Sequence, residues 1–413
     1  MSIAAIITCI IFVATVLLLI FQPIPVVIVG AAIPAILASF GIISPKTAYS
    51  DFSNTTVVFV VVFCIIGEAF FKTGLADYLG TKVIGLLGKN EKGLLLGTGI
   101  VTGGMSAFLN DTGSTACMMP IVSSMAKKAG IKRSKLLLAL SYFASLGGTI
   151  TLAGTTPHIV ANGIMKEAGL REFGFFEYTK IGLPLLIVGV LYMMYVGVKF
   201  LPDRDDGISI DEDKEAKRTE KMPICAAIFI FTIIAMASGI IPIAVAGVFG
   251  ALLVILTGCI NVKEALHVTP VSTIFLVGGI FPLSSALVKT GAAKYIVGLL
   301  APSLSSLPPF ILLLAIAALQ LIATQFLMNS SATVLVLPIA LMCCEAADID
   351  PLAGAMIVSI AASGAFASPF GSGNNLIVME AGGYSVKDYV KCGLPLTALF
   401  GVVTTVLCYI FYV

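Results

Sequence analysis

The sequence predicts an all-α polytopic membrane protein with two inverted-topology repeats. Each repeat has five transmembrane helices and one re-entrant helical hairpin, with a broken helix following each hairpin. Three observations support this prediction. Of 413 residues, 58% are hydrophobic and 11% are charged, with a mean hydropathy of +1.07, whereas soluble domains are about a quarter charged. Long apolar runs recur along the chain, and motifs of the first half return in the second. This composition excludes a water-soluble enzyme.

Long apolar runs predict the transmembrane helices, since a helix needs about 20 apolar residues to cross the hydrocarbon core. In chain order, the runs lie near residues 3–21, 24–43, 56–72, 135–169, 180–200, 223–240, 242–260, 272–288, 350–381 and 393–412. Glycine and proline clusters interrupt 135–169 and 350–381. We therefore expect these two segments to be broken helices.

Residues 92–126 and 309–343 do not read as simple crossings. Each holds two short apolar arms around a small polar cluster. Such a pattern is typical of a hairpin that enters and leaves the membrane on the same side. Irregular backbone at that depth is stable only where protein or a water-filled cavity surrounds it.

The charged segment 202–222 predicts a linker between repeat 1 (residues 1–201) and repeat 2 (residues 223–413). The sequence on one side of the linker weakly repeats that on the other. Phe71-Lys72-Thr73-Gly74 corresponds to Val288-Lys289-Thr290-Gly291, and Gly154 corresponds to Gly371. Each repeat has five crossings, and its hairpin returns to the side it entered from, so the number of crossings per repeat is odd. The second repeat is therefore expected upside down in the bilayer, as in secondary transporters.

The distribution of lysine and arginine predicts the orientation. Of the 24 basic residues, 18 fall on the side of the linker and the first hairpin mouth, and 6 fall on the other. The positive-inside rule then places the linker in the cytoplasm and both termini outside a plasma or inner membrane. A net charge of +2 offers no basic surface for nucleic acid.

Four polar clusters interrupt apolar sequence, and they form two pairs across the repeat. They are the hairpin tips at 108–115 and 326–333 and the helix breaks at 147–158 and 363–375. Each combines hydroxyl or amide side chains with glycine or proline, which release backbone groups from the helix. Carbonyl, hydroxyl and amide oxygens suit a sodium ion, and the N-termini of half-helices suit an anion. The alternative is that small and hydroxyl residues only pack helices together.

Three ionisable residues need separate readings. A carboxylate at mid-membrane costs about 2.5 to 3.5 kcal/mol, so Asp111 is expected to be functional, with helix capping as the alternative. Glu68 precedes Lys72 by four residues, which favours a structural ion pair. His158 either binds a proton or hydrogen-bonds the broken helix.

At these clusters the chain resembles the divalent anion:sodium symporter (DASS) family of the ion transporter superfamily. That family has a Ser-Asn-Thr signature at each hairpin tip and a Gly-Thr-Pro-Pro-Asn type of break in the following helix. The resemblance implies a sodium-coupled carrier, usually a homodimer, that moves its transport part like an elevator. The matching positions are Asn110, Asp111 and Thr112; Gly154, Thr155, Thr156, Pro157 and His158; and Met328, Asn329 and Ser330.

Four departures from that pattern distinguish this chain. Asp111 and His158 stand where the family has Asn, and Met328 stands where it has Ser. The second break, residues 371–376, lacks the double proline. Its Gly and Asn-Leu pattern is more similar to the superfamily's sulfate-type and uncharacterised permeases. The choice between a dicarboxylate and a sulfate-like anion is therefore open.

These residues predict cation-coupled import of a small anion. A dianion that enters against about 100 mV costs roughly 4.6 kcal/mol, so concentrative uptake requires at least two cations. We expect sodium ligands at Asn110, Asp111, Gly154, Thr155, Asn329, Gly371 and Asn375. We expect substrate contacts at Asp111, Thr112, Thr156, Asn329, Ser330 and Asn374. Asp111 is either a strong sodium ligand or the carrier of a coupled proton.

Two other functions of the same class are open: an anion exporter or exchanger, and a sodium/proton antiporter. An intramembrane enzyme is disfavoured, because the chain lacks an H-E-x-x-H motif and a G-x-S-x-G elbow around a buried serine. Two inverted hairpins favour alternating access over a continuous channel. The expected partners are the small anion, membrane lipid and a second copy of the chain.

Overall fold

The computed structural model describes residues 2–21, 23–87, 90–203, 217–238, 240–269, 271–292, 295 and 307–413. Within these residues the chain is helical with no strand, which confirms the predicted fold class. Residues 204–216, most of the predicted linker, lie outside this description. In the described part of the chain, seven helical segments are long and apolar enough to cross a membrane: 45–72, 179–199, 219–238, 271–289, 309–326, 329–346 and 386–412.

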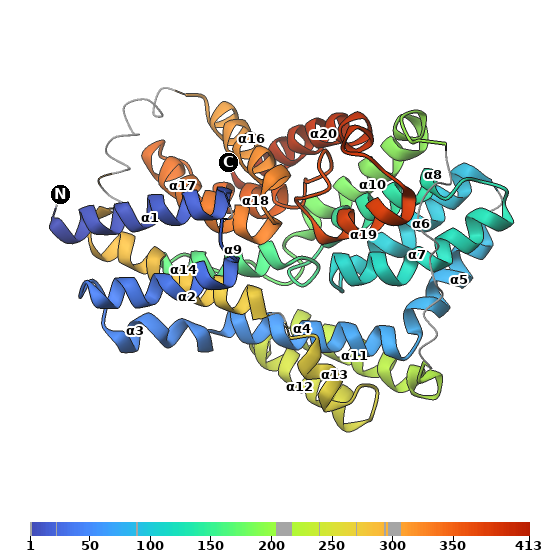
Figure 1. Ribbon diagram of the computed structural model, residues 1–413, viewed down its shortest axis with the longest axis horizontal. Coiled ribbons are helices and arrows are strands. Elements are labelled where there is room, and N and C mark those ends of the chain that lie inside the picture. Colours follow the sequence, from blue (N-terminus) through green and yellow to red (C-terminus); the bar gives the residue numbers. More distant parts are fainter. Residues whose placement is uncertain are drawn as a thin grey trace.

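In the first half, two helices flank residues 107–110, and two further helices flank residues 149–155 (Figure 1). The elements before them are α1 (Ile3–Phe21), α2 (Val26–Ser39), α3 (Pro45–Ser50), η1 (Asp51–Ser53), α4 (Thr55–Lys72) and α5 (Leu75–Leu87). The hairpin pairs α6 (Glu91–Ser106) with α7 (Asp111–Lys128). The broken helix comprises α8 (Ser134–Gly148) and α9 (Thr156–Glu167), and α10 (Thr179–Tyr195) and η2 (Gly197–Lys199) follow.

The second half follows the same order. It begins with η3 (Thr219–Lys221), α11 (Met222–Ser238), α12 (Ile243–Leu256), α13 (Val262–His267) and α14 (Val271–Lys289). The hairpin α16 (Pro309–Phe326) and α17 (Asn329–Ala346) precedes α18 (Pro351–Ala361), α19 (Gly373–Gly382) and α20 (Val386–Tyr412). The bounds of α2 and α3 return 217 residues later in α12 and α13. This agreement supports the predicted repeat, whose inversion in the bilayer stays a prediction.

Among the described helices, three were not among the predicted crossings, and one begins earlier than predicted. α3, α5 and α13 are short or carry charges such as Asp77 and Lys82 in α5, so a search for long apolar runs passes over them. α20 starts at Val386 rather than near residue 393, because Ser385 and Asp388 form a capping box. A capping box satisfies two N-terminal backbone groups and so fixes the start ahead of the apolar run.

Close helix crossings link the two halves of the chain. α2 packs on α14, and α4 packs on α12. At the first crossing a Cβ on Gly279 would lie 1.9 Å from the carbonyl oxygen of Gly30. At the second, a Cβ on Gly247 would lie 2.7 Å from Val62. Gly30 and Gly247 are themselves 217 positions apart. Small residues let the helix backbones approach closely in the membrane.

Each hairpin packs on the broken helix of its own half and on part of the broken helix of the other half. α7 contacts α8 and α19, whereas α17 contacts α18 and α9. In Figure 1 these elements lie above the row formed by α2, α3 and α4. These contacts between the two halves bring both hairpin tips and both helix breaks close together.

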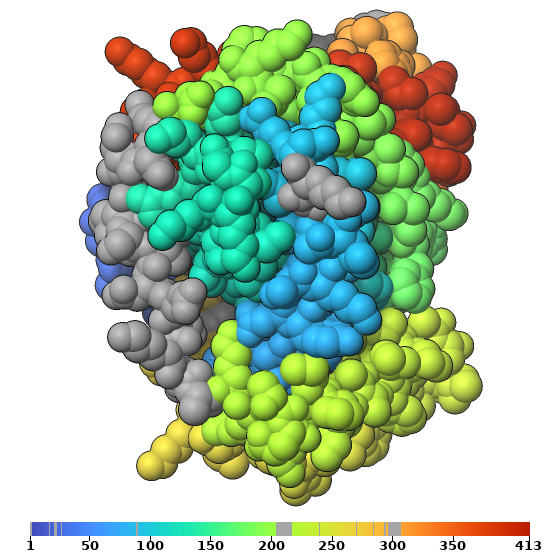
Figure 2. Space-filling model, turned by 90° about the vertical axis from the view of Figure 1, so that its right-hand side faces the viewer, coloured from blue at the N-terminus to red at the C-terminus, as the bar shows by residue number. Residues whose placement is uncertain are grey.

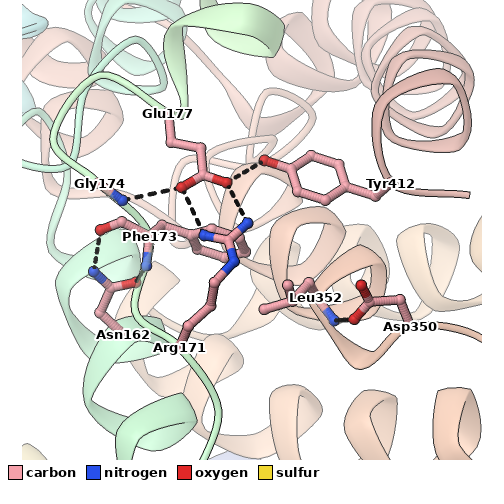
Figure 3. A network of polar contacts seen from close by, with 8 residues as sticks. All are labelled: Asn162, Arg171, Phe173, Gly174, Glu177, Asp350, Leu352 and Tyr412. Atoms are coloured by element: carbon pink, nitrogen blue, oxygen red, sulfur yellow. Dashed lines mark hydrogen bonds and ion pairs between the residues drawn. The ribbon is translucent and has the colours of Figure 1, made fainter.

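A polar network fixes the loop between α9 and α10 (Figure 3). The Glu177 carboxylate accepts hydrogen bonds from Arg171, the Gly174 N–H and the Tyr412 hydroxyl of α20. The Asn162 side chain donates to the carbonyl oxygen of Phe173 and accepts from its N–H. Burial alone raises the pKa of Glu177, but the hydrogen bonds outweigh it and lower the pKa below its ordinary value. The loop is thereby tied to both α9 and α20.

The α2–α14 crossing gives a test of the packing. Replacing a glycine inside a helix by alanine raises the free energy of unfolding by about 0.5–1 kcal/mol where the methyl group fits. A Cβ at Gly104 in α6 would meet no atom within 4 Å. The thermal unfolding temperature of Gly104→Ala in detergent should therefore equal or exceed that of the wild type. Gly279→Ala meets backbone and should destabilise the protein by about 1–3 kcal/mol. Equal unfolding temperatures for the two variants would contradict the close crossing.

Candidate functional site

Four helix N-termini converge on a cavity of about 180 Å³. They belong to α7 and α17 at the hairpin tips and to α9 and α19 after the helix breaks. The lining residues near these starts are Asn110, Asp111, Thr112, Thr155, Thr156, Met328, Asn329, Ser330, Ser372 and Gly373. Each N-terminus carries about half a positive charge. The cavity is therefore positively polarised by backbone alone.

Three of these N-termini have no side-chain cap. The residues at the cap positions of α9, α17 and α19 are Thr155, Met328 and Ser372, and none accepts a hydrogen bond from its helix. Only α7 is capped, by the Asn110 side chain on the Thr112 N–H at 2.8 Å. Uncapped first-turn N–H groups need acceptors. An anion in the cavity can supply them.

The tip of the first hairpin holds a buried carboxylate. Asp111 is 7% exposed, and its Oδ1 accepts a hydrogen bond from the Ser106 hydroxyl at 2.6 Å. A Cβ on Gly148 would lie 2.3 Å from the same oxygen, so glycine there makes room for the carboxylate. A Cβ on Gly154 would meet the carbonyl oxygens of Gly148 and Ser106 at 2.4 and 2.8 Å. Carbonyl, hydroxyl and carboxylate oxygens thus gather beside the first break.

The tip of the second hairpin has an equivalent gathering around Asn329. One atom of its side-chain amide lies 3.0 Å from the Ala362 carbonyl oxygen, 2.9 Å from that of Gly371 and 2.8 Å from the Thr324 hydroxyl. The surrounding acceptors favour the orientation with the amide nitrogen turned inward, in which Asn329 donates to all three of them. With the amide oxygen inward, four oxygens converge, and only the Thr324 hydroxyl has a hydrogen to donate. Only this second orientation presents the set of hard oxygens that a cation requires.

The two tips match residue by residue. Asp111 and Asn329 are 218 positions apart, and so are their hydroxyl partners Ser106 and Thr324. The sequence prediction missed these two hydroxyl residues and Ala362. A hydroxyl five positions before each tip residue was the available signal. The carbonyl of Ala362 had none, because any residue type provides a carbonyl oxygen.

Most of the predicted site residues line the cavity. Asn110, Asp111, Thr112, Gly154, Thr155, Thr156, Asn329, Ser330 and Gly371 all do so. Asn374 and Asn375 are not among the lining residues and are fully buried beside α8. The Asn374 amide donates to the Ser141 carbonyl and to the Ser145 hydroxyl. Asn375 donates to the carbonyl oxygens of Ala365 and Ser368. These hydrogen bonds show that the two amides hold the backbone around the second break in place.

The cavity lining contains one charged side chain. Asp111 is acidic, and no lysine, arginine or histidine lines the cavity. The lining also includes Val60, Phe63 and Cys64 of α4 and Thr273 of α14. A small anion could be held by backbone N–H groups and hydroxyl groups. No basic side chain among these lining residues neutralises the charge of such an anion.

His158 lies outside this lining, one turn into α9. Its ring is fully buried and stacks on Tyr178 at 3.8 Å between ring centroids. Nδ1 is 2.9 Å from the carbonyl oxygen of Thr151 in the first break. Of the two roles left open by the sequence, these contacts favour hydrogen bonding within the broken helix over proton binding.

Comparison with known proteins gives a consistent result. The model of the family described as citrate transporter matches residues 16–358. A sodium-dependent dicarboxylate transporter of Staphylococcus aureus is 24% identical, over 91% of this chain and 80% of its own. An uncharacterized transporter of Synechocystis is 22% identical over 94% of both chains. The solved YdaH transporter of Alcanivorax borkumensis is similar in fold, with a TM-score of 0.69, 13% identity and 98% coverage of both chains.

Proposed function

Because the chain belongs to the citrate transporter family, we propose that it is a secondary active transporter that imports a small dianion together with sodium. The family is one of transporters, and the predicted resemblance to the DASS family is confirmed by these relatives. The proposed substrate class is a dicarboxylate or a sulfate-like anion. Sodium dependence is proposed here because a dicarboxylate transporter similar over most of the chain depends on sodium.

The observation that carries the proposal is the convergence of three uncapped helix N-termini on a cavity without a basic side chain. Backbone N–H groups can orient an anion, but their partial charges do not neutralise two full charges. Two bound cations can. The site therefore has affinity for an anion only when cations accompany it, which is the requirement for coupled transport.

We assign one cation to each hairpin tip. At the second tip the proposed ligands are Asn329, Thr324 and the carbonyl oxygens of Ala362 and Gly371. At the first tip they are Asp111, Ser106 and carbonyl oxygens beside the first break, with Asn110, Gly154 and Thr155 close by. The anion then lies between the tips, near Thr112, Thr156 and Ser330. Asn374 and Asn375 support the second break behind it.

Asp111 distinguishes the first cation site from the second. The matching residue of the second tip is the neutral Asn329, so Asp111 adds one negative charge to a buried site. A carboxylate strengthens cation binding and repels a substrate anion when the cation is absent. We propose that the cation at Asp111 binds before the anion. This acid is also the observation that favours the alternative of proton-coupled exchange or sodium/proton antiport.

The packing supports an elevator type of movement. α2, α4, α12 and α14 cross closely at glycines and form one group, whereas the hairpins pack on the broken helices and form another. In the described hydrogen bonds, the side chains of Asp111 and Asn329 pair with Ser106 and Thr324 and not with any residue of α4. The α4 residues that line the cavity are mainly apolar. The second group can therefore slide along the first without breaking the cation ligands. A homodimer held by the first group is part of this proposal.

Uptake into proteoliposomes tests the function. Radiolabelled succinate, malate, citrate and sulfate are each offered with a sodium gradient or with choline in its place. We expect sodium-dependent accumulation of one anion class and its loss in Asn329→Ala, which removes a cation ligand. Ser331→Ala is the control, since Ser331 is buried one residue beyond the lined tip. Its uptake should equal that of the wild type. Accumulation without sodium, or undiminished uptake by Asn329→Ala, would overturn the assignment.

Asp111→Asn tests the role of the extra charge. We expect the sodium concentration for half-maximal uptake to rise about tenfold, the equivalent of about 1.4 kcal/mol of cation affinity. A changed pH profile with unchanged sodium dependence would instead identify Asp111 as the proton carrier. If the variant keeps both the sodium dependence and the pH profile of the wild type, Asp111 has neither role.

A further inference from the structure

A second cavity of about 430 Å³ lies apart from the transport site, where α5 and the hairpin helix α6 face α11. Its walls are hydrocarbon: no charged, hydroxyl or amide side chain is among the lining residues. These are Phe70, Leu75, Leu79, Val83, Ile100, Val101, Gly104, Met105, Phe108, Leu109, Ala226, Phe229 and Ile230. An apolar void of this kind excludes water. The lining atoms also have no packing partners on the cavity side, so binding of an apolar molecule there is favourable.

The cavity opens sideways toward the surroundings of the helices. Its rim residues Leu79, Ile100 and Ile230 are 38%, 50% and 57% exposed. They come from three different helices, and α11 is a candidate membrane span with a largely exposed surface. In Figure 2 the light blue segment of α5 and α6 adjoins the yellow-green α11 on the face turned to the viewer. In a membrane, the molecules that reach such an opening are lipid chains.

A cationic group stands beside this rim on α5. Lys82 follows the rim residue Leu79 by one helical turn, and its Nζ is 3.3 Å from the Tyr78 hydroxyl. Both side chains are exposed. The nearby carboxylate of Asp77 is paired with Lys217, so it does not compete for Lys82. Lysine and tyrosine side by side at the edge of an apolar groove suit an anionic headgroup at the membrane interface.

We propose that this cavity binds an anionic phospholipid, with one acyl chain between α5, α6 and α11 and the phosphate at Lys82 and Tyr78. The charge of Lys82 beside a purely apolar groove selects this occupant over a soluble ligand or a protein segment. Phe108 and Leu109 line the cavity directly before Asn110 and Asp111. The bound chain therefore supports the first hairpin tip from behind, whatever solute the transport site carries.

The absence of tryptophan from the sequence allows a direct test by fluorescence quenching. Ile230→Trp places a single reporter at the cavity rim. Phe231→Trp is the matched control, because Phe231 is the next residue of α11, equally exposed and outside the lining. Each full-length variant is reconstituted in phosphatidylcholine vesicles with a minor fraction of brominated phosphatidylglycerol, or with brominated phosphatidylcholine at the same fraction.

We expect brominated phosphatidylglycerol to be enriched about fivefold at Ile230→Trp relative to Phe231→Trp, as about 1 kcal/mol per lysine predicts. Adding Lys82→Gln should remove this preference for phosphatidylglycerol. Adding Gly104→Leu, at a glycine with no atom within 4 Å of its Cβ position, should fill the cavity and lower quenching by both lipids. Equal quenching of the two reporters, or a preference that survives Lys82→Gln, would overturn the proposal.

Discussion

The structure depends on how polar backbone is satisfied inside the membrane. A helix that stops in hydrocarbon exposes N–H and carbonyl groups that cost several kcal/mol each if they find no partner. In this chain, four helices begin at one small cavity. Some of the released groups are satisfied by Gln325 and Asn375, whose amides bond to backbone near the second break. The remaining groups face the cavity, where ions can be their partners.

The cavity's charge follows from the same constraint. Backbone N–H groups and hydroxyl groups recognise an anion without bringing a fixed positive charge into the membrane. Among the described residues that line the cavity, Asp111 alone is charged, and the proposed function therefore includes an accompanying cation. Coupling, in this account, is a consequence of electrostatics. Under the proposed function, the anion and the cations bind weakly alone and well together, because each offsets the electrostatic cost of binding the other.

The sequence predicted the helical class, the hairpins and the breaks, because these appear as apolar runs interrupted by glycine, proline and hydroxyl residues. It also predicted that the two tips and the first break meet at one cavity, since the motifs recur at a constant offset. It did not predict the inward roles of Ser106 and Thr324, or that Asn374 and Asn375 turn away from the cavity. Asn374 and Asn375 are adjacent polar residues just after Ser372, and the packing of α19 on α8 is what turns both of them away from the cavity.

Sodium-dependent stability without substrate tests the paired cation sites most directly. A cation that binds only the folded protein raises the unfolding temperature by mass action. We expect sodium, but not choline, to raise it in the wild type, less so in Ser106→Ala and in Thr324→Val, and hardly at all when both are combined. If the double variant responds to sodium as the wild type does, the two hairpin tips do not hold the cations and the account fails.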